Sequence, residues 1–356
     1  MKTHSIAFLI ILSLFACCHL KLEACTTFTI SKDSSIVFGR NFDFPLGEGH
    51  IHVNKRNQKK SAFIMPPEEP MCWISKFGSI TFNQAGKEFP YGGINEAGLV
   101  IEQMWLSETI YPEKDHRYGL SELQWIQYQL DMAATVDEVI ASDSMVRISY
   151  LAFSKLHFLV SDASGKSAVI EYLNGKISVK SGKNLPHAVL ANCPYERSIR
   201  YINATEDSDK ATFSDWTKNS SGRFLMAANM VHIDSIKVPL ITHAFEILDL
   251  VSQGTSTQWS IVYDISKRKI HYKTLEFDLV QTISLSDFDF SCNANSLYIG
   301  ITEKNISCDD FKIYSYAQNL EAIKHTVAHV EFLNNSVPQE YVYASAHYPE
   351  TIFCAE

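Results

Sequence analysis

Alternating apolar and polar positions predict short antiparallel strands over much of the chain. In most of the runs, β-branched or aromatic residues recur at every second position. Turns rich in Asp, Ser and Gly, or an Asn-Gly pair, separate several of the runs. The runs cover residues 26–30, 36–39, 157–161, 167–173, 176–180, 187–192, 259–264 and 269–273. The expected strands therefore pair mostly as hairpins.

Helical spacing of apolar residues appears in separate groups. The expected helices lie within residues 120–130, 136–140, 223–231, 241–251 and 320–330. Hairpins combined with grouped helices predict an α+β fold built on antiparallel sheets rather than a parallel, doubly wound sheet. Because no repeat or Pro/Gly-rich linker interrupts the chain, we expect residues 25–356 to form a single domain. Periodicity weakens after Thr274, which predicts a C-terminal appendage over about residues 275–356, held by Cys292 and Cys308.

Residues 1–24 have the pattern of a secretory signal peptide. Lys2 precedes an apolar run from Ile6 to Cys18, and the small residue Ala24 ends a short polar stretch. The run is shorter than the roughly 20 residues that span a bilayer, so we do not expect an integral membrane protein. A buried N-terminal helix and a lipoprotein processed at Cys17 are the alternatives. Cleavage after Ala24 predicts a secreted protein, located in the periplasm or outside the cell.

Composition narrows the function classes. The 356 residues carry a formal net charge of -9, from 40 acidic and 31 basic side chains, which argues against a nucleic-acid partner. The basic cluster Lys55, Arg56, Lys59 and Lys60 is interpreted as a solvated loop.

Histidine and glycine motifs give no sign of a metal or nucleotide. His325 and His329 lie four apart, but Thr326 stands where a zinc protease needs its glutamate, and His50 and His52 are interpreted as surface residues. There is no phosphate-binding loop and no Gly-x-Ser-x-Gly motif. We therefore expect neither a metal nor an organic cofactor.

The eight cysteines have no Cys-x-x-Cys spacing. Removal of residues 1–24 leaves six cysteines and makes Cys25 the first residue. In an oxidising compartment most of the others are expected to pair. The structural candidates are Cys72, Cys193, Cys292, Cys308 and Cys354. Their number is odd, so one is expected to stay unpaired or to pair elsewhere.

An N-terminal cysteine combines a nucleophile and a base in one residue. Its thiolate attacks carbonyl carbons, and its α-amine, with an ordinary pKa of about 7.7 to 8.0, lies beside the thiol. The expected hairpin brings Arg40 and Asp43 back to the sheet end that carries Cys25. Arg40 then lowers the thiol pKa, and Asp43 accepts hydrogen bonds from the amine. The alternative is that Cys25 is an ordinary half-cystine.

The run Cys25-Thr-Thr-Phe, followed by Gly-Arg-Asn-Phe-Asp-Phe at residues 39–44, resembles the start of choloylglycine hydrolases. This family includes bile salt hydrolases and penicillin V acylases, which are N-terminal-nucleophile hydrolases of linear amides. Further segments resemble the family in the same order, up to about Thr274. They are residues 91–99, 157–171, 189–194, 221–224 and 257–260.

The resemblance implies a four-layer αββα sandwich of antiparallel sheets. It also implies that Cys25 attacks an amide carbonyl and that Asn192, with a backbone N–H near Trp105, stabilises the oxyanion. Arg40 and Arg223 would keep the nucleophile region electropositive. No cofactor is implied, the partner is a small N-acyl amide, and relatives suggest a homo-oligomer.

Trp105 occupies the position at which bile salt hydrolases carry an active-site asparagine. Some Gram-negative relatives in the penicillin-acylase branch are similar to this sequence in placing tryptophan there. Trp105 and Phe44 are expected to contact substrate, which favours aromatic or fatty acyl groups. Bile salt hydrolysis is the alternative activity. A secreted, non-catalytic binding protein on the same scaffold is the alternative of another class.

Overall fold

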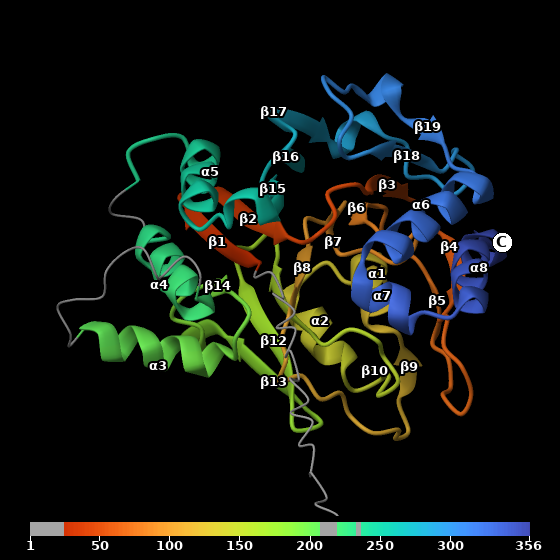
Figure 1. Cartoon of the computed structure of the whole chain (residues 1–356), viewed down its shortest axis with the longest axis horizontal. Coiled ribbons are helices and arrows are strands. Elements are labelled where there is room, and N and C mark those ends of the chain that lie inside the picture. Colours follow the sequence, from red (N-terminus) through yellow and green to blue (C-terminus); the bar gives the residue numbers. More distant parts are fainter. Residues whose placement is uncertain (1–24, 207–218, 233–235) are drawn as a thin grey trace, which may run out of the picture.

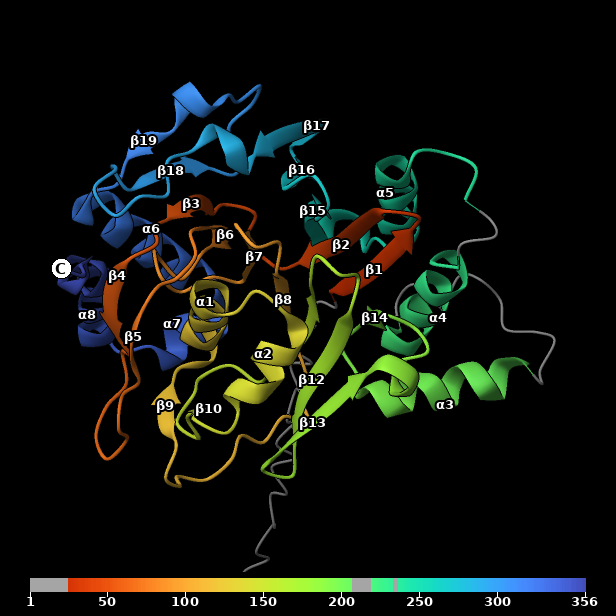
Figure 2. The same ribbon diagram turned by 180° about the vertical axis from the view of Figure 1, so that it is seen from behind.

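The computed structural model describes residues 25–206, 219–232 and 236–356, and the expected signal peptide, residues 1–24, lies outside them. Two antiparallel sheets lie face to face, with helices on the outer side of each (Figure 1, Figure 2). The four-layer α+β sandwich is therefore confirmed.

The smaller main sheet has six strands, all antiparallel. In spatial order they are β14 (Val189–Leu190), β1 (Thr26–Lys32), β2 (Ser35–Asp43), β15 (Thr257–Asp264), β16 (Lys269–Thr274) and β17 (Phe277–Ser284). The expected hairpins β1–β2 and β15–β16 are both present. In each, two neighbouring strands pair across a short turn.

The larger sheet has nine antiparallel strands. In spatial order they are β13 (Lys176–Ser181), β12 (Ser167–Leu173), β11 (Leu156–Ser161), β8 (Val100–Trp105), β7 (Gly92–Asn95), β6 (Ser79–Asn83), β3 (His50–Asn54), β18 (Leu297–Gly300) and β19 (Lys312–Ile313). Two small sheets accompany it. One pairs β9 (Tyr118–Leu120) with β10 (Val146–Ile148) in parallel, and the other orders β20 (Phe353–Cys354), β4 (Gln58–Ser61) and β5 (Cys72–Ile74).

Helices cover the outer faces of both main sheets. On the six-stranded side lie α3 (Tyr195–Glu206), α4 (Ser220–Met230) and α5 (Leu240–Leu250), of which α3 was not expected from the sequence. On the nine-stranded side lie α1 (Glu122–Met132) and α2 (Val136–Ser142). Side-chain oxygens of Ser121 and Thr135 cap α1 and α2, which explains where these helices begin.

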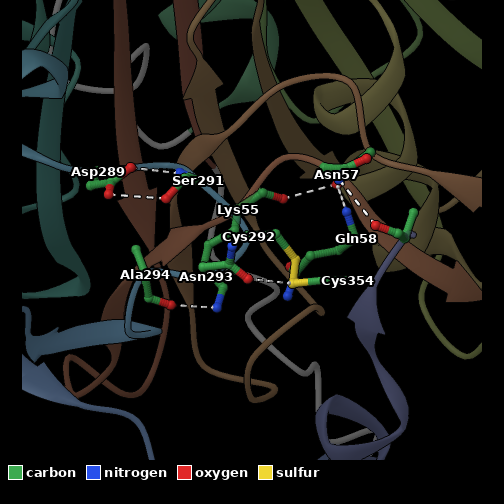
Figure 3. The surroundings of a disulfide bond; sticks show 11 residues. Lys55, Asn57, Gln58, Asp289, Ser291, Cys292, Asn293, Ala294 and Cys354 are labelled. Carbon is green, nitrogen blue, oxygen red and sulfur yellow. Dashed lines mark hydrogen bonds between the residues drawn. A yellow bond between two sulfur atoms is a disulfide. The ribbon is translucent and has the colours of Figure 1, made fainter.

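The C-terminal segment is integrated into the fold rather than appended to it. Strand β17 completes the six-stranded sheet, and β18 and β19 extend the nine-stranded one. Three helices follow, namely α6 (Tyr316–His329), α7 (Glu331–Ser336) and α8 (Gln339–His347). A disulfide joins Cys292 to Cys354 near the chain end (Figure 3), and Cys308 is free. The expectation that Cys308 holds this region was therefore wrong, and Cys72 and Cys193 are also unpaired.

The basic cluster is not a solvated loop. Lys59 and Lys60 lie on β4, where alternate side chains point to opposite faces, and Lys60 points inward. Its Nζ lies 2.6 Å from Glu88 and 2.9 Å from Asp131, and all three side chains are buried. His52, on β3, is likewise buried rather than exposed. Lys60 is partnered inside the protein by these two carboxylates, which hydropathy alone does not indicate.

Among residues 25–206, 219–232 and 236–356, no helix combines the length and apolar character that a bilayer requires. The same described residues contain no group of three or more His, Cys, Asp or Glu side chains arranged to hold a metal ion.

Candidate active site

The β1–β2 hairpin sets the frame of the candidate site. Cys25 immediately precedes β1, and Thr26 and Thr27 pair with Asn41 and Arg40 on β2. On the other side of β2, Thr257 of β15 pairs with Asp43. The register brings Arg40 and Asp43 to the sheet end that carries Cys25, as the sequence predicted.

Cys25 is almost completely buried, with 6% of its surface exposed. Its thiol donates to the Asp43 carbonyl oxygen, with 3.9 Å between sulfur and oxygen. Burial raises the pKa of the Cys25 thiol, and the negative charge of Asp43 adds to this effect. The positive charge of Arg40 and a hydrogen bond from it oppose both, so formation of the thiolate depends on this guanidinium.

Arg40 connects the two sheets. Its Nη1 forms a salt bridge with Glu102 of β8 and donates to the Tyr91 carbonyl oxygen at 3.3 Å. Tyr263 of β15 donates to the other Glu102 oxygen at 2.5 Å. Within the described residues, Nε and Nη2 of Arg40 make no hydrogen bond of ordinary geometry, which leaves part of the guanidinium available to Cys25.

Glu102 is the charge that balances Arg40. Burial raises the pKa of Glu102 to about 7, against the lowering effects of Arg40 and of the hydrogen bond from Tyr263. The sequence reasoning missed both Glu102 and Tyr263. The available signal was a single carboxylate within the otherwise mostly apolar strand Val100–Trp105.

Asp43 is held from the same strand, β15. Its Oδ1 accepts a hydrogen bond from Thr257 Oγ1 at 2.5 Å, and the carboxylate is almost fully buried. Thr257 lies in a segment that resembles the family, and that resemblance implies no role for it. Its hydroxyl fixes one oxygen of the carboxylate beside the nucleophile.

Asn192, Arg223 and Trp105 form a chain of contacts next to Cys25. Asn192 Nδ2 donates to the Trp105 carbonyl oxygen at 2.8 Å, and Arg223 Nη2 donates to Asn192 Oδ1 at 3.4 Å. Arg223 Nε also donates to Thr26 Oγ1 at 3.1 Å. Both functional groups of the Asn192 amide are thus engaged, which fixes its orientation and leaves the second N–H of Nδ2 for a ligand.

Arg223 lies in the first turn of α4, where the helix dipole disfavours a cation. Its side chain is nevertheless fully buried. Burial lowers the pKa of Arg223, and the negative charges of Asp43, Cys25 and Cys193 oppose this effect. The contacts with Thr26 and Asn192 provide the specific partners that its unfavourable position suggested.

A cavity of about 270 Å³ opens onto Cys25. Its lining is mostly apolar, and among the residues that the structure describes it contains no lysine or arginine. Phe44 and Trp105, the two residues expected to contact substrate, both belong to this lining. Phe44 stacks on Phe42 with 5.1 Å between ring centroids, and Trp105 meets Phe332 of α7 edge-on at 6.3 Å. The structure therefore places the five expected catalytic residues together and the two expected contact residues on the wall of the adjacent cavity.

Comparison with known proteins identifies similarity to one family of amide hydrolases. A model of linear amide C–N hydrolases of the choloylglycine hydrolase family matches residues 25–207. A penicillin V acylase from Pectobacterium atrosepticum is 35% identical over 137 residues, which is 34% of this chain and only 36% of that protein's length.

Two solved structures share the fold. The penicillin V acylase from Agrobacterium tumefaciens has a TM-score of 0.69 at 24% identity, covering 82% of this chain and 98% of that one. A point mutant of the conjugated bile acid hydrolase from Clostridium perfringens has a TM-score of 0.63 at 19% identity, covering 82% of this chain and 97% of that one.

Proposed function

The chain belongs to the choloylglycine hydrolase family of linear amide C–N hydrolases, and from that membership we propose that it cleaves an N-acyl amide with an apolar acyl group, using the Cys25 thiol as nucleophile. The observation that carries the proposal is a buried thiol that opens onto an apolar cavity beside Arg40 and Asn192. Substrates of the penicillin V or fatty acyl amide type fit this lining best, and conjugated bile salts are the runner-up.

In the first proposed step, the Cys25 thiolate attacks the amide carbonyl carbon. The oxyanion accepts a hydrogen bond from the free N–H of Asn192 Nδ2 and one from a backbone N–H near Trp105, each donor being worth roughly 3 kcal/mol. The α-amine of Cys25 takes the thiol proton and passes it to the leaving nitrogen as the C–N bond breaks. Asp43, whose backbone carbonyl contacts the Cys25 thiol, is proposed to stabilise the protonated form of this amine.

In the second proposed step, water hydrolyses the thioester. The Cys25 α-amine removes a proton from the attacking water, and the same donors stabilise the second oxyanion. The C–S bond breaks, the acyl group leaves as a carboxylic acid, and the thiol is restored. Arg40 stabilises the thiolate as it leaves, because its positive charge is the strongest influence favouring the ionised thiol.

The mechanism requires a free α-amine on Cys25, so residues 1–24 must be removed. We propose that they act as a secretory signal and that the mature protein is located in the periplasm or outside the cell. Mass spectrometry of the exported protein is expected to find Cys25 as the first residue. A mature chain that starts at Met1 or Cys17 would contradict the mechanism and favour the non-catalytic binding protein.

A small substrate panel tests the proposed activity. Penicillin V and a medium-chain fatty acyl amide are expected to be hydrolysed with at least roughly tenfold higher kcat/KM than glycine- or taurine-conjugated bile salts, because Trp105 and Phe44 present apolar, stackable surface beside Cys25. The measurement is the rate at which the free acid is released, quantified by chromatography. A preference for conjugated bile salts would reverse this assignment within the family.

A further inference from the structure

We infer that the C-terminal helices α6, α7 and α8 form the distal wall of the acyl site and set the length of an unbranched, apolar acyl chain. The inference rests on the proposed function, since it assigns the cavity beside Cys25 to the acyl group of the substrate. It concerns a part of the chain beyond residue 207, where the match to the family model ends.

All three helices contribute apolar side chains to the cavity. Ile323 and Val327 come from α6, Phe332 and Leu333 from α7, and Tyr341 from α8. The rest of the lining includes Cys25, residues at the end of the β1–β2 hairpin and Trp105, whose ring contacts Phe332. The cavity thus reaches from the nucleophile to these helices, which follow one another at the C-terminal end of the chain (Figure 1).

The wall is anchored to the turn that follows β6. Thr326 Oγ1 donates to the Gln84 carbonyl oxygen at 2.9 Å, and the backbone N–H of Lys87 donates to Asn319 Oδ1 at 2.9 Å. Between these contacts, Gly86 has a φ of +93°, and a Cβ there would lie 2.6 Å from Ile323 Cδ1. Helix α6 thus packs directly on the turn, which positions the wall rigidly.

The helices also hold one another. Ile323 of α6 packs with Val342 and Ala346 of α8 in a small apolar cluster of their own. The Cys292–Cys354 disulfide, seen in Figure 3, fixes the chain shortly after α8, and Cys354 lies on β20, which pairs with β4. The distal wall therefore has its own apolar core and is attached to the rest of the protein at the turn after β6 and through the disulfide. A wall that limits the length of a bound chain needs this rigidity.

The chemistry of the cavity matches a hydrocarbon chain. Its volume of about 270 Å³ equals on the order of nine water-sized groups at ~30 Å³ each, which leaves room for a hydrocarbon chain of medium length. Glu122 of α1 contributes a carboxyl group to the cavity lining. Its Oε1 accepts a hydrogen bond from the Ser154 backbone N–H at 2.9 Å. Burial raises the pKa of Glu122, which favours its neutral form in this lining.

The test measures kcat/KM for a series of straight-chain N-acyl amides from acetyl to dodecanoyl. For the wild type, kcat/KM is expected to rise about fourfold per methylene up to roughly decanoyl. Tyr341→Ala and Phe332→Ala each remove a ring from the distal wall, and each is expected to lower the decanoyl-to-acetyl ratio of kcat/KM at least roughly tenfold. Val337, which directly follows α7, also lines the cavity. Val337→Phe adds a ring there and is expected to move the optimum to shorter chains.

Tyr343 offers a matched control on the same helix. It is 41% exposed and does not line the cavity, so Tyr343→Ala is expected to keep the ratio within about twofold of the wild type. If amides are hydrolysed and neither Tyr341→Ala nor Phe332→Ala changes the ratio beyond that margin, the inference is overturned while the proposed function stands.

If the wild type hydrolyses no amide, the proposed function fails and calorimetric binding of decanoate decides the inference alone. Binding to Tyr341→Ala that is roughly tenfold weaker, with unchanged binding to Tyr343→Ala, would support the distal wall. Equal affinities for both variants would overturn it.

Discussion

Replacing Cys25 by alanine is expected to abolish amide hydrolysis while leaving the protein folded. Loss of the nucleophile removes the covalent route altogether, an effect on the order of 10⁴- to 10⁶-fold in kcat. The thiol donates only a weak hydrogen bond to the Asp43 carbonyl oxygen, and its removal leaves only a small cavity. The free energy of unfolding should therefore change by no more than about 1 kcal/mol. Steady-state kinetics and chemical denaturation on the same preparation measure both quantities.

Cys25→Ser separates the chemistry from the packing. The hydroxyl keeps the shape of the side chain, but it ionises far less readily than a thiol, so this variant is also expected to be nearly inactive. Cys308→Ala, which removes an exposed free cysteine, is the matched control and should retain wild-type activity. Substantial turnover by Cys25→Ala would place the nucleophile elsewhere and end the proposed mechanism.

The nucleophile and its hairpin could be predicted from the sequence because their geometry is local. Once residues 26–30 and 36–39 are recognised as paired strands, the register alone carries Arg40 and Asp43 to the position of Cys25. The placement of Asn192 and Arg223 depended on the resemblance to a family instead, since nothing in their neighbouring residues indicates a contact between segments so far apart in the chain.

The rest of the site depends on long-range packing that sequence patterns do not encode. Glu102 becomes a partner of Arg40 only because two sheets stack face to face. Phe332 and Tyr341 line the cavity, but they lie in the region after Thr274, where weak periodicity predicts only an appendage. Disulfide connectivity has the same limit, because spacing did not indicate that Cys292 pairs with Cys354.

Arg40 is the second position at which a large effect is expected, and here stability and catalysis can be separated. Arg40→Met removes the counter-charge of the buried Glu102 carboxyl, whose pKa then rises further above its ordinary value, so Glu102 must either take up a proton or stay charged without a partner. The cost is expected to reach about 3–5 kcal/mol of unfolding free energy above neutral pH, where Glu102 ionises. Glu102→Gln leaves Arg40 unpaired and is expected to cost a similar amount. The double variant Arg40→Met/Glu102→Gln removes both charges, and Tyr263 can still donate to the glutamine oxygen, so most of the lost stability should return.

Activity is expected to behave differently, because the Arg40 charge lowers the pKa of the Cys25 thiol against the effect of burial. Without Arg40 that pKa rises, less thiolate is present at neutral pH, and the acidic limb of the kcat/KM profile moves to higher pH in both Arg40→Met and the stable double variant. Glu102→Gln removes the opposing negative charge, so its acidic limb should move to lower pH. Denaturation curves and pH–rate profiles of the four proteins measure these shifts. A double variant that recovers wild-type kcat/KM along with its stability would show that Arg40 serves folding alone.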